Sequence, residues 1–363
     1  MSNKVLFLHK CFVKGGGVER VHQNLSAALQ QQNINTCFFV LHGYGESEAG
    51  YNSLQNTQQA QRPNVNAGLV KKLKAVFDCI KANEIGAIIA ATEQANMVAF
   101  LCKLRFPRLN IVYTRHCAFD VSDQKLPPWA IKLLYSLYAM NGQIVGVSKA
   151  LQQQIKDTLL FNKKAVHFVP NAVVDDSIYL KAETNSDNWQ HTDYLVAVGR
   201  LVEQKGFDLL LNAYAQALRL DSQLPKLMVI GEGEDKSQLV AQAAQLGLTE
   251  HVFFTGFTTN PYYAIKRAKA FILSSRHEGM PTVLVESMAL NTPVIAFDCP
   301  TGPSELIVKG KNGVLVPHLD VAALALAISQ YQNLPQEDIS HYVQDFCYPK
   351  VANAYLTLCE GNT

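Results

Sequence analysis

The sequence predicts an α/β protein of two doubly wound domains, each with a largely parallel sheet, that face a central cleft. Three observations predict this fold. The chain has 363 residues, which suffices for two domains of ordinary size. In both halves, short β-branched runs alternate with amphipathic stretches. A polar segment without sustained periodicity, residues 174–192, lies between the halves as the expected linker. We therefore place the domains at residues 1–175 and 190–340.

The first half opens with a buried strand at residues 4–9, a tight glycine turn at 15–17 and an amphipathic helix at 18–31. The apolar face of this helix consists of Val18, Val21, Leu25, Ala28 and Leu29. Further strands are predicted at residues 36–41, 86–91, 110–114, 143–147 and 165–169. Helical patterns lie between most of these strands, so the sheet is expected to be mostly parallel.

The second half repeats the same alternation more clearly. Its strands are predicted at residues 194–198, 227–230, 251–254, 270–274, 293–297 and 313–316. Its helices are predicted at residues 207–220, 235–246, 260–268, 281–290, 303–308 and 320–332. A last helical pattern, at about 341–363, has no strand after it, and we expect it to pack back onto the first domain. Ligands of such sheets bind where the strands end, so we look for chemistry in the loops that follow strands.

Composition excludes several classes of protein. With 48% apolar and 17% charged residues, the chain is neither disordered nor a small disulfide-stapled scaffold. No apolar run reaches the roughly 18 residues that span a bilayer, and we expect neither a signal peptide nor a transmembrane helix. The eight cysteines form no C-x-x-C pair, which indicates reduced thiols and a cytoplasmic protein. Neither H-E-x-x-H nor D-x-D occurs, so we expect no metal and no cofactor.

The charges are distributed unevenly. Residues 1–180 contain 19 Lys and Arg against 11 Asp and Glu, whereas residues 181–363 contain 13 against 19. The stretch 68–81 combines Lys71, Lys72, Lys74 and Lys81 with an apolar face of Leu69, Leu73, Val76, Phe77 and Ile80. This pattern predicts contact with the anionic inner face of a membrane, with residues 127–138 as a second contact. The alternative is that both stretches are core-packed helices with solvated lysines.

The strongest motif is residues 274–289, where a predicted strand ends and a helix begins. Pro281 suits the first helical turn, and the free amides of that turn favour an anion. Glu278 precedes the helix and Glu286 lies inside it, so one carboxylate is placed to bind sugar hydroxyls and the other a ribose, with phosphates between them. In the alternative interpretation, Glu278 caps the helix and Glu286 is solvated.

Three other segments follow predicted strands. After the strand at 194–198, Gly199 allows close backbone approach, and Arg200 and Lys205 are placed to neutralise a diphosphate, unless they are simply solvated loop residues. The glycines 15–17 allow positive φ and precede a helix, although they do not match G-x-G-x-x-G. His116 follows the strand at 110–114 and is assigned either a polar role toward substrate or a structural one.

These residues together resemble a known family. The pair Glu278 and Glu286, the Gly199-Arg200-Leu201 and Lys205-Gly206 segments, the early glycines and the segment 169–172 are similar to the retaining glycosyltransferases of family 4. The resemblance covers nearly the whole chain and implies the GT-B fold of two Rossmann-like domains. Residues 298–305 resemble those of bacterial enzymes that build lipopolysaccharide, capsule or lipid-linked oligosaccharides.

The resemblance implies a role for each matching residue. Arg200 and Lys205 would hold the donor diphosphate, and Glu278 and Glu286 the sugar and the ribose. Contacts to the phosphates, the sugar, the base (uracil is expected) or the acceptor are implied for Gly279, Met280, Thr282, Val283, Phe257, Thr258, Gly16 and Gly17. His116 would touch the transferred sugar. Asp120 departs from the family pattern because Cys117, Ala118 and Phe119 intervene after His116, so no role is assigned to it.

The implied reaction is the transfer of a hexose or N-acetylhexosamine, with retention and without a metal. The donor would be a nucleotide diphosphate sugar, with UDP-Gal, UDP-GalNAc or UDP-Glc/GlcNAc expected, and the acceptor a glycan or a lipid-linked glycan. The first domain would bind the acceptor and the second the donor, and attack would occur from the leaving-group side without a covalent intermediate. The alternatives are an epimerase or a phosphorylase on the same fold, or a non-catalytic subunit that binds nucleotide sugar for a partner transferase. No nucleic acid partner is expected.

Overall fold

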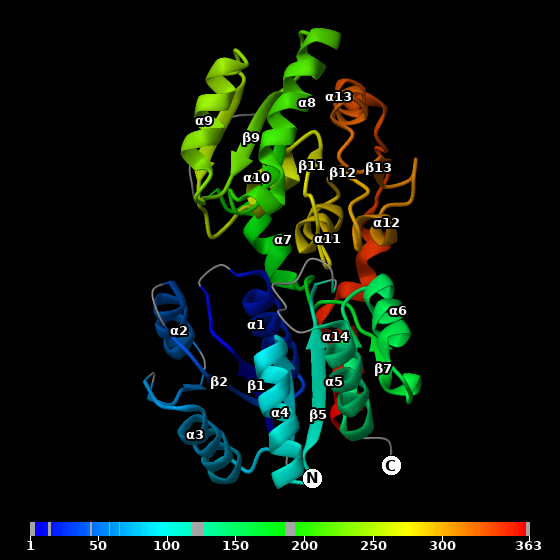
Figure 1. Cartoon of the computed structure of the whole chain (residues 1–363). Coiled ribbons are helices and arrows are strands. Elements are labelled where there is room, and N and C mark those ends of the chain that lie inside the picture. The colour runs from blue at the N-terminus through cyan, green and yellow to red at the C-terminus, as the bar shows by residue number, and fades with distance from the viewer. Residues whose placement is uncertain are drawn as a thin grey trace. The chain divides into compact units, whose positions relative to one another are not determined.

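The computed structural model describes residues 4–13, 16–43, 46–57, 59–64, 66–117, 119, 127–185 and 193–360. The chain forms two compact units (Figure 1). Unit 1 contains Met1–Ala172 and Phe346–Thr363, and unit 2 contains Val173–Asp345. Each unit has its own parallel sheet covered by helices. The prediction of two doubly wound, Rossmann-like α/β domains is therefore confirmed.

The described residues of unit 1 form one parallel sheet in the order β3-β2-β1-β4-β5-β6-β7. Its strands are β1 (Lys4–His9), β2 (Asn35–Val40), β3 (Ala60–Gln61), β4 (Ala87–Ala91), β5 (Asn110–Arg115), β6 (Gln143–Gly146) and β7 (Val166–Phe168). The strand order reverses between β1 and β4. At such a switch point the loops after neighbouring strands diverge to opposite faces of the sheet and leave room for a ligand.

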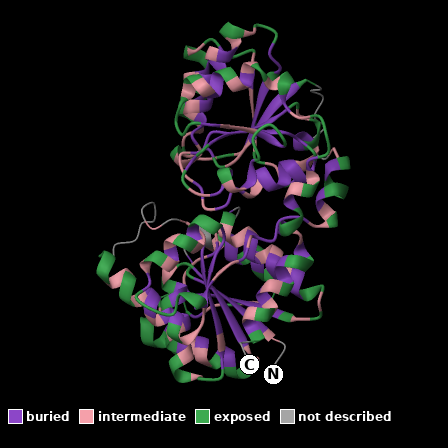
Figure 2. Ribbon diagram, turned by 90° about the vertical axis from the view of Figure 1, so that its right-hand side faces the viewer, coloured by how far each residue is buried: buried purple, intermediate pink, exposed green. Residues whose placement is uncertain are grey.

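Two helical layers cover this sheet. One core contains side chains of α3 (Leu69–Ala82), α4 (Glu93–Arg105), α5 (Pro128–Asn141) and α6 (Lys149–Thr158). The other contains side chains of α1 (Gly17–Gln30), α2 (Glu46–Thr57) and the C-terminal α14 (Tyr348–Glu360). Figure 2 shows the strands as the buried layer between helices that are exposed on their outer sides.

The strand β1 shows why the central strands are continuously apolar. Leu6 and Leu8 belong to the core on one side of the sheet, whereas Val5 and Phe7 belong to the core on the other side. Successive side chains of a strand point to opposite faces, so a strand covered on both faces must be apolar at every position.

Unit 2 repeats this architecture with the strand order β10-β9-β8-β11-β12-β13. The strands are β8 (Tyr194–Val198), β9 (Lys226–Ile230), β10 (Val252–Gly256), β11 (Phe271–Leu273), β12 (Val294–Phe297) and β13 (Gly313–Val316). The helices are α7 (Asp176–Glu183), α8 (Phe207–Leu220), α9 (Lys236–Gln245), α10 (Tyr262–Arg267), α11 (Thr282–Ala289), α12 (Pro303–Leu306) and α13 (Val321–Ser329). Because β8 and β11 are neighbours, loops about 70 residues apart in sequence meet at one edge.

The structure differs from the sequence expectations in two short polar elements, in the linker and in the bounds of the last helix. Neither α2 nor the two-residue strand β3 was expected, since both are short and polar. The expected linker at 174–192 contains α7, which packs against α10 in unit 2. Near the C-terminus, the 3-10 helix at Ser340–Phe346 precedes α14, and α14 packs against α1 of unit 1, where Asn110 Nδ2 donates to the Cys359 carbonyl at 2.7 Å.

Most of the apolar face predicted for the stretch 68–81 packs against the core of unit 1, whereas Leu69 at its start is 64% exposed. In α3, Val76 and Ile80 are buried in the core, and Lys72 is buried with its Nζ 2.8 Å from His42 Nδ1. The alternative interpretation therefore holds for Val76 and Ile80, and contact of this helix with a membrane stays a prediction. Lys71, Lys74 and Lys81 remain exposed.

Two further expectations concern membranes and thiols. Among the described residues, no helix has the length and apolar character needed to cross a membrane. The eight cysteines all lie in the described residues and none of them is in a disulfide; Cys37, Cys79, Cys102, Cys299 and Cys359 are buried.

Candidate functional site

An ion pair joins the two loops that follow β8 and β11 in unit 2. Lys205 Nζ lies 2.6 Å from Glu278 Oε1, and Ser275 Oγ donates to the same oxygen at 2.7 Å. Glu278 is 7% exposed, so this carboxylate is nearly buried and is held by one cation and one hydroxyl. Both residues were predicted as site residues from the sequence, whereas their direct contact and the part of Ser275 were not.

The same two loops are held together by a second set of polar contacts. Arg276 forms a bidentate pair with Asp208, with both N–O distances at 2.7 Å. Hydrogen bonds from Arg276 hold the pKa of the Asp208 carboxyl below its ordinary range. Gln204 Nε2 donates to the His277 carbonyl at 3.0 Å, and Thr301 Oγ1 donates to the Glu278 carbonyl. The backbone that carries Glu278 is therefore fixed from both sides.

Glycines allow segments of backbone to approach closely at the carboxyl edge of the unit 2 sheet, but Gly199, where the sequence predicted this, is not one of them. A Cβ on Gly199 would make ordinary contacts. A Cβ on Gly231, in contrast, would lie 1.9 Å from the Gly199 carbonyl oxygen, and one on Gly206 would lie 2.1 Å from the Ser274 carbonyl oxygen. Gly206 and Gly231 also have positive φ, 62° and 147°. The steric constraint therefore falls on Gly206, which the sequence analysis named only as part of a motif, and on Gly231, which it did not name.

The helix α11 begins directly after the loop of Glu278. Its N-terminal amides extend from Thr282, with Pro281 before them in an extended conformation. Glu286 is 1% exposed, which rules out the alternative that it is a solvated helix residue. Met280 is buried, and the other residues predicted to contact phosphate or sugar are partly exposed: Gly279, Thr282 and Val283.

The remaining predicted donor residues lie at the surface of unit 2. Arg200 follows β8 and is exposed. Phe257 follows β10 and is 59% exposed, and Thr258 Oγ1 beside it accepts a hydrogen bond from the Asn260 amide at 2.9 Å. Arg200 and Phe257 thus present a cation and an aromatic ring at the same carboxyl edge of the sheet.

In unit 1, His116 belongs to a cluster of three histidines at the carboxyl ends of β1 and β5. His9 and His22 are buried, and His22 Nδ1 lies 3.1 Å from His9 Nε2. The rings of His22 and His116 are 5.3 Å apart and packed edge to face. Sequence reasoning missed His9 and His22, although His9 ends a predicted strand and His22 falls on the apolar side of the first helix.

Hydrogen bonds define the tautomer of His116. Thr114 Oγ1 donates its single hydrogen to the Ala90 carbonyl at 2.8 Å, so it can only accept from His116 Nε2, 3.0 Å away. Burial, and then the charge of Arg115, lowers the pKa of His116 to about 4. His116 is therefore neutral at pH 7, with the proton on Nε2 and a lone pair on Nδ1 that can accept a hydroxyl hydrogen.

Arg115, the residue before His116, is fixed by contacts with three other side chains. Its guanidinium pairs with Glu93, donates to the Tyr135 hydroxyl at 3.0 Å and lies 3.8 Å from the centre of the Phe119 ring. This network also escaped the sequence reasoning. Asp120, to which no role was assigned, falls outside the described residues.

The early glycines act differently from the expectation. Gly16 precedes α1 with a φ of −65°, and neither Gly16 nor Gly17 has the positive φ that glycine permits. A Cβ on Gly16 would lie 2.0 Å from a carboxylate oxygen of Glu19, whereas a Cβ on Gly17 would meet nothing within 4 Å. Gly17 therefore leaves open space at the helix N-terminus. Gly15 is outside the described residues.

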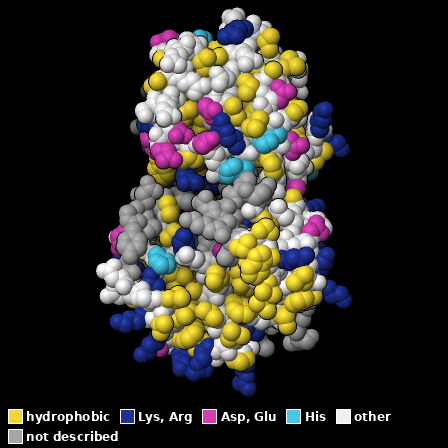
Figure 3. Space-filling model, viewed as in Figure 1, with side chains coloured by type: hydrophobic (Ala, Val, Ile, Leu, Met, Phe, Trp, Pro, Cys, Tyr) yellow, Lys and Arg dark blue, Asp and Glu magenta, His cyan; other side chains and the backbone are white. Residues whose placement is uncertain are grey.

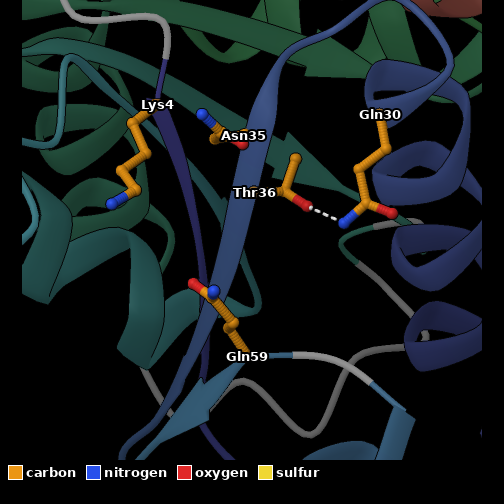
Figure 4. Close-up of a pocket in the computed structure, with 5 residues that line it drawn as sticks. All are labelled: Lys4, Gln30, Asn35, Thr36 and Gln59. Carbon is orange, nitrogen blue, oxygen red and sulfur yellow. Dashed lines mark hydrogen bonds between the residues drawn. The ribbon is translucent and has the colours of Figure 1, made fainter.

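Two cavities in the described residues lie away from these site residues. One, of about 230 Å³, is lined by Lys4, Gln30, Asn35, Thr36 and Gln59 (Figure 4). Lys4, Asn35 and Thr36 begin β1 and β2, so this cavity lies at the edge of the sheet opposite to His116. Within the described residues, no three His, Cys, Asp or Glu side chains are grouped to hold a metal ion.

Two family models match the chain in succession. Residues 15–177 match the model described as Glycosyltransferase Family 4, and residues 182–344 match that of Glycosyl transferases group 1. The boundary between the two matches lies close to the boundary between the two units of the structure.

Three curated relatives are similar in sequence. An uncharacterized glycosyltransferase of Methanocaldococcus jannaschii is 37% identical over 54% of this chain, and the match spans 50% of that protein. The amylovoran biosynthesis glycosyltransferase AmsD of Erwinia amylovora is 26% identical over 84% of this chain and 83% of its own length. An N-acetylgalactosamine-N,N'-diacetylbacillosaminyl-diphospho-undecaprenol 4-alpha-N-acetylgalactosaminyltransferase of Campylobacter jejuni is 33% identical over 51% of this chain and 49% of its own length.

The fold is also found among solved structures. HepE of Anabaena, crystallised with UDP, superimposes with a TM-score of 0.79 at 19% identity and covers 99% of this chain and 100% of its own. The lipopolysaccharide outer core galactosyltransferase WaaB superimposes with a TM-score of 0.71 at 17% identity, over 98% of this chain and 99% of its own. With the two matching models and this fold, the chain belongs to the family 4 glycosyltransferases of GT-B architecture.

Proposed function

We propose that this protein is a retaining glycosyltransferase that moves a hexose or N-acetylhexosamine from a UDP-sugar to a glycan or lipid-linked acceptor in bacterial surface polysaccharide synthesis. The observation that carries the proposal is the cluster of Lys205, Glu278 and Ser275 beside the N-terminus of α11. It places a fixed cation and a fixed carboxylate where backbone amides favour a phosphate.

Unit 2 is the proposed donor domain. Lys205 has three ammonium hydrogens, of which one points to Glu278, so the others are available to phosphate oxygens. Glu278 would bind sugar hydroxyls and the buried Glu286 a ribose. A uracil is proposed against Phe257 and Thr258, and the crystal structures of HepE with UDP and UDP-glucose support a UDP-sugar.

The proposed chemistry depends on stabilising the leaving diphosphate. Negative charge develops on the phosphate as the glycosidic bond breaks, and Lys205, Arg200 and the α11 amides supply fixed positive charge without a metal. Attack on the same side of the sugar would give retention, and a phosphate oxygen of the leaving group would accept the proton of the acceptor hydroxyl. Glu278 is already held by Lys205 and Ser275, so we assign it to sugar binding and not to nucleophilic attack.

Unit 1 is the proposed acceptor domain. The Nδ1 lone pair of His116 would accept a hydrogen bond from a sugar hydroxyl, and the open space at Gly17 would admit the substrate. Names of relatives support a surface glycan: one acts in amylovoran synthesis, one on a diphospho-undecaprenol-linked sugar, and LpsE of Rhizobium meliloti in lipopolysaccharide core synthesis. Such acceptors would bring the protein to the anionic inner face of the cytoplasmic membrane.

The test is a screen of UDP- and GDP-sugars for slow donor hydrolysis by the full chain. We expect one UDP-hexose or UDP-N-acetylhexosamine to release UDP, with activity that survives EDTA. Lys205→Ala and Glu278→Ala should abolish release. Lys236→Ala is the matched control, because Lys236 forms an exposed ion pair with Glu232 in the same unit. Release with GDP-sugars only, loss of activity with EDTA, or full activity of Lys205→Ala would each contradict part of the proposal.

A further inference from the structure

A threonine in the loop after β12 has a backbone conformation that L-amino acids rarely adopt. Thr301 has a φ of 69°, and among the described residues it and Thr92 are the two β-branched residues with positive φ. A β-branched side chain is crowded by its own backbone in this region, so surrounding contacts must impose the conformation. Strain of this kind gathers at functional sites. The segment 298–305, which contains Thr301, has no role in the donor site proposed above.

The loop of Thr301 packs against the loop that carries Glu278. The strands β11 and β12 are neighbours in the sheet of unit 2, so the loops that follow them meet. Thr301 Oγ1 donates a hydrogen bond to the Glu278 carbonyl. A Cβ on the next residue, Gly302, would lie 2.5 Å from Pro281 Cδ, so the two loops leave no room for a side chain there. The strained residue therefore lies at the contact between the two loops.

Glu278 depends on protein groups for its position because it is nearly buried. Figure 3 shows other Asp and Glu side chains of unit 2 at the surface, on the face in view. Contacts of exposed carboxylates count for little, because water and salt screen them. Glu278 is only 7% exposed, so its neighbours fix it. Lys205 and Ser275 hold Oε1 of its side chain, and Thr301 holds its carbonyl.

We propose that Thr301 is a positioning residue for the donor sugar. Its hydroxyl, held in place by the strained backbone, fixes the peptide of Glu278 where the carboxylate meets the sugar hydroxyls. The inference rests on the proposed role of Glu278 in sugar binding. Thr301 acts through Glu278 alone, whereas Lys205 and the α11 amides bind the diphosphate. Loss of the Thr301 hydroxyl should therefore weaken binding of the sugar part of the donor and leave binding of the UDP part unchanged.

The experiment is calorimetric titration of the full chain with UDP and with the preferred UDP-sugar. Thr301→Val keeps the branched shape and removes the hydroxyl. We expect its Kd for the UDP-sugar to rise about fivefold, the size of one neutral hydrogen bond, and its Kd for UDP to stay within about twofold of the wild type. Thr301→Ser keeps the hydroxyl and should bind both ligands as the wild type does.

A glycine variant separates the strain from the hydrogen bond. Thr301→Gly accepts positive φ without crowding, so it should unfold at a higher urea concentration than Thr301→Val. It also lacks the hydroxyl, and it should therefore bind the UDP-sugar as weakly as Thr301→Val does. The matched control is Leu319→Gly, which relieves a positive φ of 61° elsewhere in unit 2 and should leave both affinities unchanged.

The outcomes distinguish this inference from the proposed function. Wild-type affinity of Thr301→Val for the UDP-sugar would overturn the inference, and so would an equal loss of affinity for UDP, because Thr301 would then support the whole site. Failure of Thr301→Ser to bind as the wild type, or a Thr301→Gly variant no more stable than Thr301→Val, would also overturn it. In each of these cases the wild type still binds the UDP-sugar and the proposed function holds. If the wild type binds no UDP-sugar, the proposed function fails and the inference fails with it.

Discussion

The two units share a doubly wound fold, but their candidate sites differ in electrostatic character. Unit 1 contains 20 Lys and Arg against 10 Asp and Glu, yet its predicted site residue His116 is neutral and sits in a cluster of buried imidazoles. Unit 2 contains 12 against 20, yet its site is built around the cation of Lys205. The comparison teaches that the net charge of a domain does not indicate the charge of its site. In each unit, the charge of the candidate site is set by the residues in the loops that follow the strands.

The largest expected effect comes from the cation of unit 2. Lys205→Ala removes positive charge from the proposed phosphate site and leaves the Glu278 carboxylate nearly buried without its ion pair. We expect kcat/KM for the donor reaction to fall by about 10³, the upper part of the range for a lost charge-stabilising group. Steady-state kinetics with the preferred UDP-sugar provides the measurement. A loss below tenfold would remove Lys205 from the proposed chemistry.

Low pH should destabilise unit 1 more than unit 2. Burial, and then His116, lowers the pKa of His9 to about 3, and burial also lowers the pKa of His22 well below its ordinary value. Unfolded histidines bind protons below about pH 6.5, whereas these folded ones do not, so the stability of unit 1 falls as pH drops from about 6.5 toward 4. At pH 5, His9 and His116 should each lower the free energy of unfolding by about 2 kcal/mol.

Hydrogen exchange at pH 7 and pH 5 measures this difference. Asp208 in unit 2 has a pKa held below its ordinary range, so its pair with Arg276 should survive until below about pH 4. Unit 1 should therefore lose protection first. Equal loss of protection in both units at pH 5 would show that the histidine cluster does not set the acid response. The variant His22→Gln should make the stability of unit 1 depend less steeply on pH and leave that of unit 2 unchanged.

The next largest effect is the loss of stability expected from a substitution at Gly231 in unit 2. Gly231→Ala would force a Cβ to within 1.9 Å of the Gly199 carbonyl oxygen and displace the strand end that carries Arg200. We expect a loss of about 3 kcal/mol in the free energy of unfolding. Gly310→Ala is the control, because Gly310 also has positive φ but has open space around it; about 1 kcal/mol is expected there. Urea unfolding measures both, and equal losses would mean that φ alone matters.

The smallest effect tests the tautomer in unit 1. Thr114→Val removes the acceptor that holds the proton on His116 Nε2, so part of the population should change to the Nδ1-protonated form. The kcat/KM for transfer should fall about tenfold, the cost of one hydrogen bond to a neutral group. Nitrogen NMR of the imidazole reports the tautomer directly. Thr114→Ser keeps the hydroxyl and should have the kcat/KM and the tautomer of the wild type. If it does not, the role of Thr114 is packing by its methyl group.

Much of the fold could be predicted because it depends on local patterns. The strand at 194–198 and the helix at 207–220 were predicted at their observed bounds, since a short continuous apolar run and a helical periodicity can both be recognised from neighbouring residues. Short polar elements such as α2 and β3 lack that pattern. In α3, Lys72 is buried with its Nζ 2.8 Å from His42 Nδ1, and a helical pattern does not contain a contact with a residue 30 positions away.

The sequence by itself determined the class of the fold, the loops that carry chemistry and the residue types in them, because these follow from hydrophobic period and from the position of each residue after a strand. The tertiary structure alone decided which of those residues meet. Lys205 contacts Glu278, 73 residues away, because β8 and β11 are neighbours in a sheet whose strand order departs from the chain order. The histidine cluster likewise joins α1 to the ends of β1 and β5. Strand order is set by the burial of whole helical layers, a property that no local pattern contains.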